Sequence, residues 1–129
     1  MIFFNDPVVI PDAAERAVRM ALAMRERVQE LKAGWRKLGH DLDFGVAIAQ
    51  GYATIGAIGF EGRWEYGAIG TVPNLAARLC AEAKPGEILV SQRLLRSVED
   101  TVEAEPAGEL TLKGFHRPVP AYQILRLKA

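Results

Sequence analysis

The chain has 129 residues, half of them hydrophobic, which is enough for one domain with a buried core. Its 16 basic residues balance its 16 acidic residues, so the charge favours neither nucleic acid nor an anionic membrane as a partner. A single cysteine excludes an internal disulfide framework, and because no signal peptide or membrane-length apolar run is visible we expect a cytoplasmic protein.

The N-terminal part predicts a strand followed by a long helix. Met1–Phe4 is apolar and aromatic, which is typical of a strand. Apolar residues then recur at helical spacing and predict a helix from about residue 11 to residue 38. Asp12 and Glu15, three residues apart at its start, have the pattern of a capping box.

Two strand-like runs follow, at residues 42–50 and 52–58. Gln50-Gly51 lies between them and predicts a tight hairpin turn. The glycine-rich stretch 56–62 lacks the lysine and hydroxyl residues of a phosphate loop, so its glycines indicate a tight connection instead.

The stretch from Tyr66 to Leu79 predicts a strand, a glycine turn and a helix. The strand covers Tyr66–Ile69, Gly70 breaks it, and Thr71 is the expected N-cap of a helix that runs to about Ala83. Cys80 falls within this helix and is expected to be a small buried apolar residue.

Asn74 and Arg78 lie on one face of this predicted helix. They are four residues apart, so they are separated by one turn, roughly 6 Å along the axis. An amide and a guanidinium side by side near a helix N-terminus suit an anionic or ether oxygen. Spacing alone, however, favours ordinary exposed helix residues.

The C-terminal part predicts mostly strands. Proline and glycine at 85 and 86 end the preceding helix. The expected elements are a strand at 87–91, a helix at 92–98, and strands at 101–105, 109–112 and 119–127. We therefore expect one α+β domain over residues 1–129, with a mainly antiparallel sheet and helices packed on one face.

Several motifs together resemble one family. The stretch 66–79, Lys84–Ser91, Leu112–Phe115 and Pro118–Tyr122 are similar, in order and spacing, to the C-terminal part of a class III adenylate/guanylate cyclase catalytic domain. Upstream, residues 3–7 and 12–18 resemble the stretch that follows the family's second metal-binding aspartate. The resemblance covers essentially the whole chain.

This resemblance implies a ferredoxin-like nucleotide cyclase fold and conversion of ATP or GTP into a 3′,5′-cyclic nucleotide and pyrophosphate. Two metal ions, Mg²⁺ or Mn²⁺, serve the complete domain, and sites form at a dimer interface. Asn74 matches the asparagine that orients the ribose, and Arg78 matches the arginine that stabilises the transferring phosphate. Lys113 matches the lysine that contacts the outer phosphates; without the resemblance, a solvated lysine beside a glycine turn is preferred.

The chain also departs from the family pattern. Both metal-binding aspartates and the purine-reading lysine match positions upstream of Met1, so we expect this chain alone to bind no metal and to be inactive. Gly67 matches the second base-reading position and offers no side chain, which leaves ATP and GTP equally open. Thr71 and Pro73 replace the family's commonest aspartate and valine without excluding activity.

The same departure predicts an incomplete, N-terminally truncated sheet. The family's missing segment supplies two strands, so a bare sheet edge is expected, and we predict a dimer or a strand-swapped dimer that covers it. Two other functions stay open. One is a non-catalytic cyclase-homology module for dimerisation or nucleotide sensing, which the absent aspartates and Gly67 favour, and the other is a plain ferredoxin-like interaction domain.

Overall fold

The computed structural model describes residues 1–6 and 8–128. Its helices are α1 (Ala13–Lys37), α2 (Thr71–Glu82) and α3 (Gln92–Val98). Its strands are β1 (Val46–Ile48), β2 (Thr54–Phe60), β3 (Arg63–Ile69), β4 (Ile88–Ser91), β5 (Val102–Leu110) and β6 (Val119–Leu127). Among the described helices, none is long and apolar enough to cross a bilayer.

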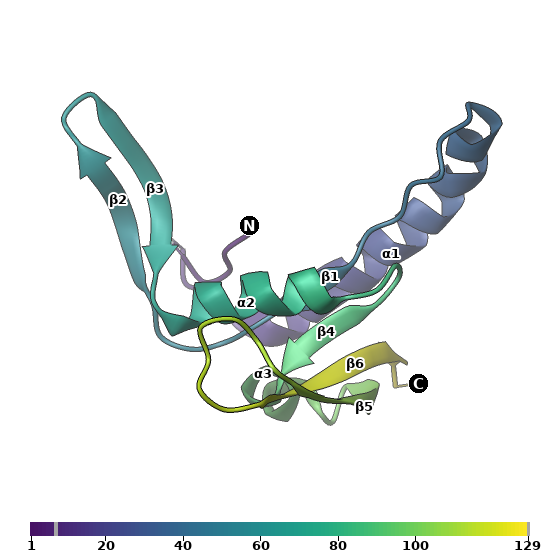
Figure 1. Cartoon of the computed structure of the whole chain (residues 1–129). Helices are drawn as coiled ribbons and strands as arrows, with labels where there is room; N and C mark the ends of the chain where they lie inside the picture. The colour runs from purple at the N-terminus through teal and green to yellow at the C-terminus, as the bar shows by residue number, and fades with distance from the viewer. Residues whose placement is uncertain (7, 129) are drawn as a thin grey trace.

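The strands form one larger sheet and one separate hairpin. The larger sheet has the order β1-β4-β6-β5, and only the β1–β4 pair in it is parallel. Strands β2 and β3 pair with each other in an antiparallel hairpin that extends away from the sheet (Figure 1). The expected α+β architecture with a mainly antiparallel sheet is therefore confirmed.

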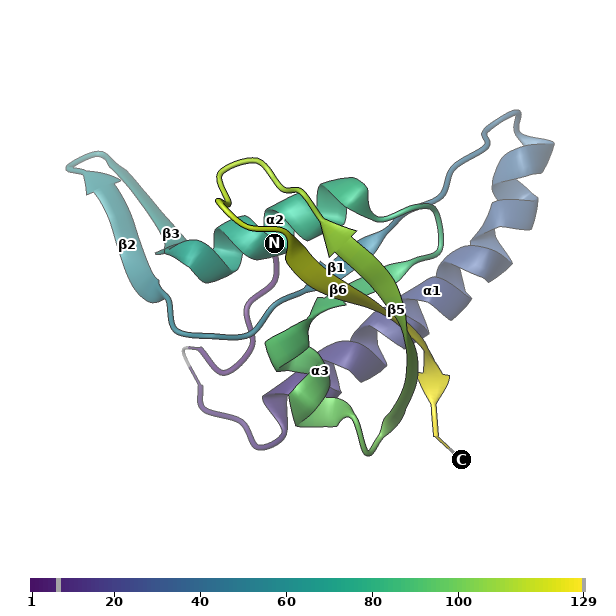
Figure 2. The same ribbon diagram turned by 60° about the horizontal axis from the view of Figure 1, so that its bottom comes forward.

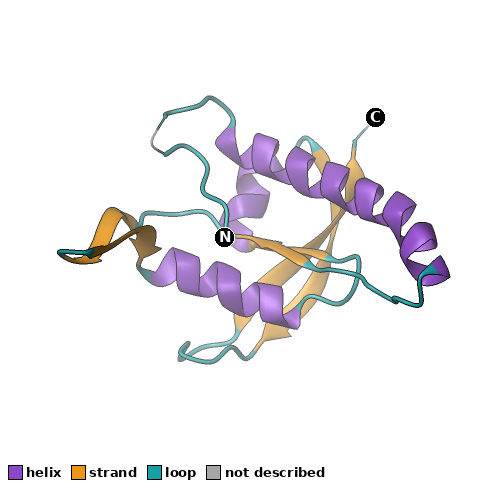
Figure 3. Cartoon of the chain, turned by 90° about the horizontal axis from the view of Figure 1, so that it is seen from above, coloured by secondary structure: helices purple, strands orange, loops and turns teal. Residues whose placement is uncertain are grey.

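The helices cover two faces of the larger sheet, not one as the sequence predicts. On one face, the side chains of Ile88 and Val90 pack in a buried cluster with Val18 of α1 and Leu94 of α3. On the other face, Ala121 packs with Leu79 of α2. Figure 3 shows α1 and α2 on opposite sides of the strands. Because neighbouring strand residues point to opposite faces, a strand such as β4, which is buried throughout, requires cover on both.

Polar contacts fix α1 to the sheet and to the segment that follows it. The guanidinium of Arg25 donates to the carbonyl oxygen of Leu125 at 2.6 Å. The C-terminal end of α1 projects from the body, and the chain runs back alongside it (Figure 1). There, the ammonium of Lys32 lies 2.8 Å from a carboxylate oxygen of Asp43.

Three local predictions in the first half are wrong. Met1–Phe4 forms no strand. Asp12 is the N-cap residue of α1, but its backbone is left-handed, with φ of 52°, and its side chain makes no capping hydrogen bond. Gln50-Gly51 does not join a hairpin, because β1 pairs with β4 and β2 pairs with β3.

Contacts to α3 explain the path of the chain between β1 and β2. The hydroxyl of Ser97 donates to the side-chain oxygen of Gln50 at 2.8 Å. The guanidinium of Arg93 lies 5.5 Å from the centre of the Tyr52 ring, a cation–π geometry. These contacts hold residues 50–52 against α3 as a crossing segment, which leads to the hairpin seen at the side of the molecule in Figure 2.

The predictions for β5 and for Cys80 are also wrong. The strand predicted at residues 101–105 and the one predicted at 109–112 form a single strand, β5, which continues through Pro106 and Gly108 with a register shift between them. An edge strand tolerates proline because one side needs no donor. Cys80 is exposed instead of buried, with its sulfur 3.8 Å from the carbonyl oxygen of Gly45.

The Lys32–Asp43 pair makes stability depend on pH. The Lys32 ammonium, assisted by the backbone N–H of Phe44, holds the pKa of the Asp43 carboxyl below its usual value. A lowered pKa stabilises the fold fully above the unfolded-state value of about 4, and this contribution is lost as the pH falls through the folded-state value. We expect Asp43→Asn to lower the urea midpoint at neutral pH, and the difference from wild type to shrink below about pH 4.

Asp41→Asn is the matched control, because Asp41 is exposed and its nearest cationic contact, Arg36, is 3.8 Å away. This variant should have the same urea midpoint as wild type, both at neutral pH and below about pH 4. A constant difference between Asp43→Asn and wild type across the acid range would contradict the assignment.

Candidate functional site

Helix α2 presents three different faces. Gly70 is its N-cap residue, with φ of 142° and no side-chain capping bond, so the expected Thr71 cap is wrong and Thr71 is the first helical residue. Thr71, Asn74 and Arg78 follow the i, i+3, i+7 spacing of one exposed stripe. Leu79 lies on another face and is fully buried.

The loop between β5 and β6 lies against this helix because apolar side chains anchor it. Leu112 is 4 % exposed and packs in the cluster that contains Leu79, and Phe115 packs against the same cluster. The backbone N–H of Phe115 donates to the carbonyl oxygen of Leu112 at 3.1 Å, which closes a turn. Gly114 sits inside this turn with φ of 88°, a conformation that favours glycine. The exposed Lys113 is therefore displayed at the tip of the turn.

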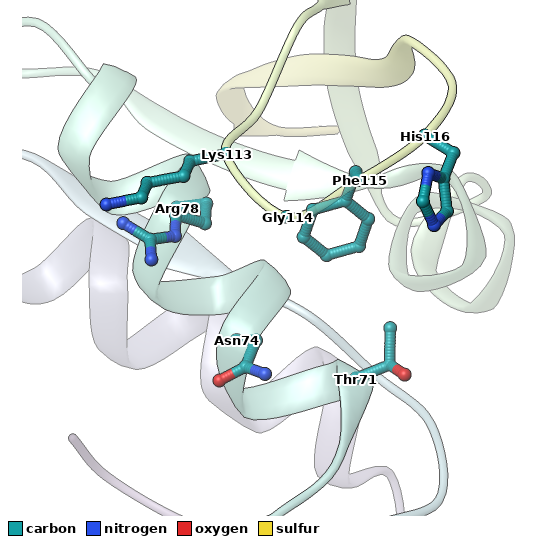
Figure 4. Close-up of a pocket in the computed structure, with 7 residues that line it drawn as sticks. All are labelled: Thr71, Asn74, Arg78, Lys113, Gly114, Phe115 and His116. Carbon is teal, nitrogen blue, oxygen red and sulfur yellow. The ribbon is translucent and has the colours of Figure 1, made fainter.

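Helix and loop together form a pocket of about 290 Å³. The residues that line it are Thr71, Asn74, Arg78, Lys113, Gly114, Phe115 and His116. Figure 4 shows the Arg78 guanidinium and the Lys113 ammonium at one end, Thr71 and His116 at the other, and Asn74 on the helix between them.

The pocket has the electrostatic character of an anion site. Arg78 and Lys113 are both exposed, and neither has an ion pair or side-chain hydrogen bond within the described part of the chain. The described lining residues include no carboxylate. Two neighbouring cations without an internal counter-ion favour a ligand with negative charge, and phosphate oxygens match both donor types.

The structure thus brings together three of the four site residues predicted from sequence. Gly67 lies apart from them, in β3 opposite Gly56 of the hairpin, and does not line the pocket. Sequence reasoning missed Phe115 and His116 as lining residues. Their closeness to Lys113 in the chain was the available signal, but only the packing of Phe115 shows that this loop faces α2.

The described residues do not fit a metal site. No group of three or more histidine, cysteine, aspartate or glutamate side chains is placed to hold an ion in the described ranges. The pocket offers an amide, a hydroxyl, an imidazole and two cations, whereas Mg²⁺ and Mn²⁺ prefer carboxylate oxygens.

A larger and mainly apolar groove lies on another side of α2. It has a volume of about 1050 Å³ and runs along the free edge of β1, between α1 and α2. Small side chains of α2 line it, namely Pro73, Ala76, Ala77 and Cys80. The groove also reaches Ile55 and Ala68 at the base of the β2–β3 hairpin. The bare edge expected from sequence is thus present at β1.

Comparisons with known proteins agree on one family. The family model for the adenylate and guanylate cyclase catalytic domain matches residues 1–126. Adenylate cyclase 1 of Rhizobium meliloti is 30% identical over 125 residues, which cover 95% of this chain and 19% of that protein. The chain therefore spans about a fifth of the length of this curated relative.

Solved structures have the same fold. The adenylyl cyclase CyaB from P. aeruginosa superposes with a TM-score of 0.85 at 34% identity, covering 95% of this chain and 64% of that one. The guanylyl cyclase Cya2 gives a TM-score of 0.84 at 28% identity, with coverages of 97% and 64%. The guanylate cyclase domain of RhGC from Catenaria anguillulae, solved in complex with GTP, gives 0.81 at 23% identity, with coverages of 97% and 66%. At 23% identity, the similarity to the RhGC domain supports a shared fold only.

The role of the turn that displays Lys113 can be tested by a substitution that strains its backbone. Alanine at Gly114 meets no atom within 4 Å, but it is strained at φ of 88° by about 1–2 kcal/mol. We expect Gly114→Ala to weaken binding of inorganic triphosphate several-fold, because the Lys113 turn is populated less. Isothermal titration calorimetry measures this affinity, and thermal unfolding measures the cost in stability.

Gly86→Ala is the matched control. Gly86 has φ of 81°, also meets nothing within 4 Å, and lies in a similar turn from Lys84 to Glu87 outside the pocket. The two variants should lose similar stability, but only Gly114→Ala should lose affinity. Equal affinities in both variants would show that the turn does not position a ligand contact.

Proposed function

Because the chain belongs to the adenylate and guanylate cyclase catalytic-domain family, we propose that it is part of a single domain that converts a nucleoside triphosphate into a 3′,5′-cyclic nucleotide and pyrophosphate. The observation that carries this proposal is the pocket in which Asn74, Arg78 and Lys113 meet without a carboxylate among the described lining residues. The chain spans 64% of the CyaB and Cya2 chains, so the proposed activity belongs to a larger assembly of residues than those described.

The two cations are proposed to hold the phosphates. In the reaction, the ribose 3′-hydroxyl gives up its proton to solvent and its oxygen bonds to the α-phosphorus, while the bond from that phosphorus to the bridging oxygen breaks and pyrophosphate leaves. Negative charge on the phosphoryl oxygens is stabilised by donors that are already oriented. Arg78 is held on a helix and suits the transferring phosphate, while Lys113 on the loop suits the outer phosphates.

Asn74 and Gly67 are proposed to contact the nucleoside part. Asn74 lies one helical turn from Arg78 on the exposed stripe of α2, so its amide can bond to a ribose oxygen while Arg78 contacts phosphate. Gly67 is outside this pocket, and we assign it to a composite site in which the hairpin of a second copy lies against the base. Glycine offers no side chain there, and both ATP and GTP remain candidate substrates.

Mg²⁺ or Mn²⁺ is proposed as the cofactor of the complete domain. Because the described residues hold no cluster suited to these ions, we propose that other parts of the complete domain supply their ligands. We also place the protein in the cytoplasm, where nucleoside triphosphates are made and used.

We propose that two copies of the chain form a homodimer in which the β2–β3 hairpin is the interface. This two-stranded sheet extends from the body in Figures 1 and 2, and two strands alone are marginally stable in water. Trp64 is 60% exposed on it, and Ile69 is 56% exposed at its base. A second copy would bury these side chains. Strand exchange along the free edge of β1 is the alternative route to a dimer.

A non-catalytic nucleotide-sensing module is the second candidate function. The favouring observation is the combination of a cationic pocket with the lack of a metal-binding cluster among the described residues. Such a module would bind triphosphate through Arg78 and Lys113 without turning it over. Family membership makes a plain interaction domain without nucleotide binding the weakest of the alternatives.

Removing the pocket cations tests the proposed roles. Each charge-assisted contact is worth about 1.5–3 kcal/mol, so Arg78→Ala and Lys113→Ala should each weaken triphosphate binding by about 10- to 100-fold. In an upstream-extended chain, Arg78→Ala should lower cyclic nucleotide production from ATP or GTP with Mn²⁺ by at least a similar factor. Calorimetry and chromatography of the products measure the two effects.

Arg96→Ala is the matched control, because Arg96 is an exposed helical arginine of α3 outside the pocket. It should bind and react like wild type. Full activity of Arg78→Ala would overturn the role of Arg78, and triphosphate binding without any turnover in the extended chain would favour the sensing module.

The dimer is tested by light scattering over a concentration series. We expect mass to approach twice that of the monomer as concentration rises, and Trp64→Ser to shift this transition to higher concentration because it removes apolar area from the hairpin. Leu38→Ser is the control, since Leu38 is 73% exposed at the far end of α1. A wild-type monomer at every concentration would contradict the dimer, and equal behaviour of Trp64→Ser and wild type would exclude the hairpin as its interface.

A further inference from the structure

We propose that His116 is a third polyphosphate ligand of the pocket, and that its protonation makes the affinity for triphosphate rise as the pH falls through neutrality. The inference rests on the proposed function, because it takes the pocket to be a triphosphate site. It adds a residue that neither the motif resemblance nor the family comparison assigns, and it adds a property of binding that Arg78 and Lys113 cannot supply.

The position of His116 carries the argument. It lines the same pocket as Arg78 and Lys113, but Figure 4 shows it at the opposite end, near Thr71. Phe115 separates it from the Lys113 turn and is packed in the apolar cluster under α2. The loop therefore holds Lys113 on one side of a fixed anchor and His116 on the other, so that inorganic triphosphate, which has no ribose to occupy the position beside Asn74, meets a donor at each end.

The charges in the pocket link protonation of His116 to polyphosphate binding. Arg78 of α2 and Lys113 of the same loop are the described charged residues of the pocket, and Arg117 follows His116 in the chain. A neutral imidazole donates one hydrogen bond, whereas an imidazolium donates two and adds a positive charge. A bound polyphosphate attracts the positive charge of the imidazolium. Protonation and polyphosphate binding therefore strengthen each other, as linkage requires.

His116 is also free to act in this way. It is exposed, and its imidazole has no hydrogen bond or ion pair with the described residues. Its replacement should leave the fold intact, since Leu112 and Phe115 make the contacts that hold the loop. Arginine and lysine keep their charge across the neutral range, so only a histidine among the lining residues can make binding change there.

The experiment measures binding of inorganic triphosphate to the full chain by calorimetry at about pH 8 and about pH 6, which bracket histidine titration. Wild type, His116→Gln and His116→Lys are compared. Triphosphate changes its own protonation in this range equally for all variants, so the ratio of affinities isolates the side chain. At the higher pH, we expect wild type and His116→Gln to have similar affinities. At the lower pH, wild type should bind triphosphate roughly five- to tenfold more tightly than His116→Gln does. His116→Lys should bind tightly at both.

The sequence supplies a matched control, because His40 is the only other histidine and lies beyond the end of α1. His40→Gln should follow wild type at both pH values. In NMR titrations, triphosphate should move the titration midpoint of the His116 imidazole to higher pH and leave that of His40 unchanged. This second readout reports the linkage directly and needs no enzymatic activity.

The outcomes separate this inference from the proposed function. Binding that depends on Arg78 and Lys113 but has the same pH response in wild type and His116→Gln would overturn the role of His116 and leave the triphosphate site standing. No binding in any variant at either pH would overturn the triphosphate site itself. An unchanged His116 titration at saturating triphosphate would also reject the inference.

Discussion

The packing of the β5–β6 loop against the buried side of α2 is the interaction on which the pocket depends. Leu79, Leu112 and Ala121 form its buried centre, and Phe115 packs against them. Burial of each large apolar side chain contributes about 1.5–3 kcal/mol, so this cluster can hold Lys113 near Arg78 although the two cations repel each other. The polar side chains that line the pocket have no hydrogen bond or ion pair with the described residues, so they remain available to a ligand.

Much of the fold follows from local sequence signals, and the pocket follows only in part. The apolar periodicity of α1 and α3 and the composition of β6 predict these elements to within two residues. The i, i+4 spacing places Asn74 beside Arg78 on any helix. Lys113 is different, because its distance from Arg78 is set by tertiary packing, and only the family resemblance identified it. His116 was missed for the same reason.

Three of the failed predictions share one cause, which is that long-range pairing and topology override local sequence signals. Gln50-Gly51 has the composition of a hairpin turn, but β1 gains a parallel partner in β4 and Ser97 holds Gln50 in the crossing segment. Proline at 106 would interrupt a central strand, yet β5 lies at the sheet edge and accommodates it with a register shift. The two-faced cover of the sheet likewise depends on topology, which periodicity does not contain.

The three faces of α2 join the fold to the proposed chemistry. One stripe carries Asn74 and Arg78 into the pocket, a second buries Leu79 against the sheet, and a third borders the groove through Ala76, Ala77 and other small side chains. Small residues permit a close approach, so a chain segment that fills the groove presses directly on α2. Because Leu79 is packed in one cluster with Leu112 of the β5–β6 loop, that cluster ties the helix to the loop. A partner that covers the edge of β1 therefore contacts the same helix that carries Asn74 and Arg78 into the pocket.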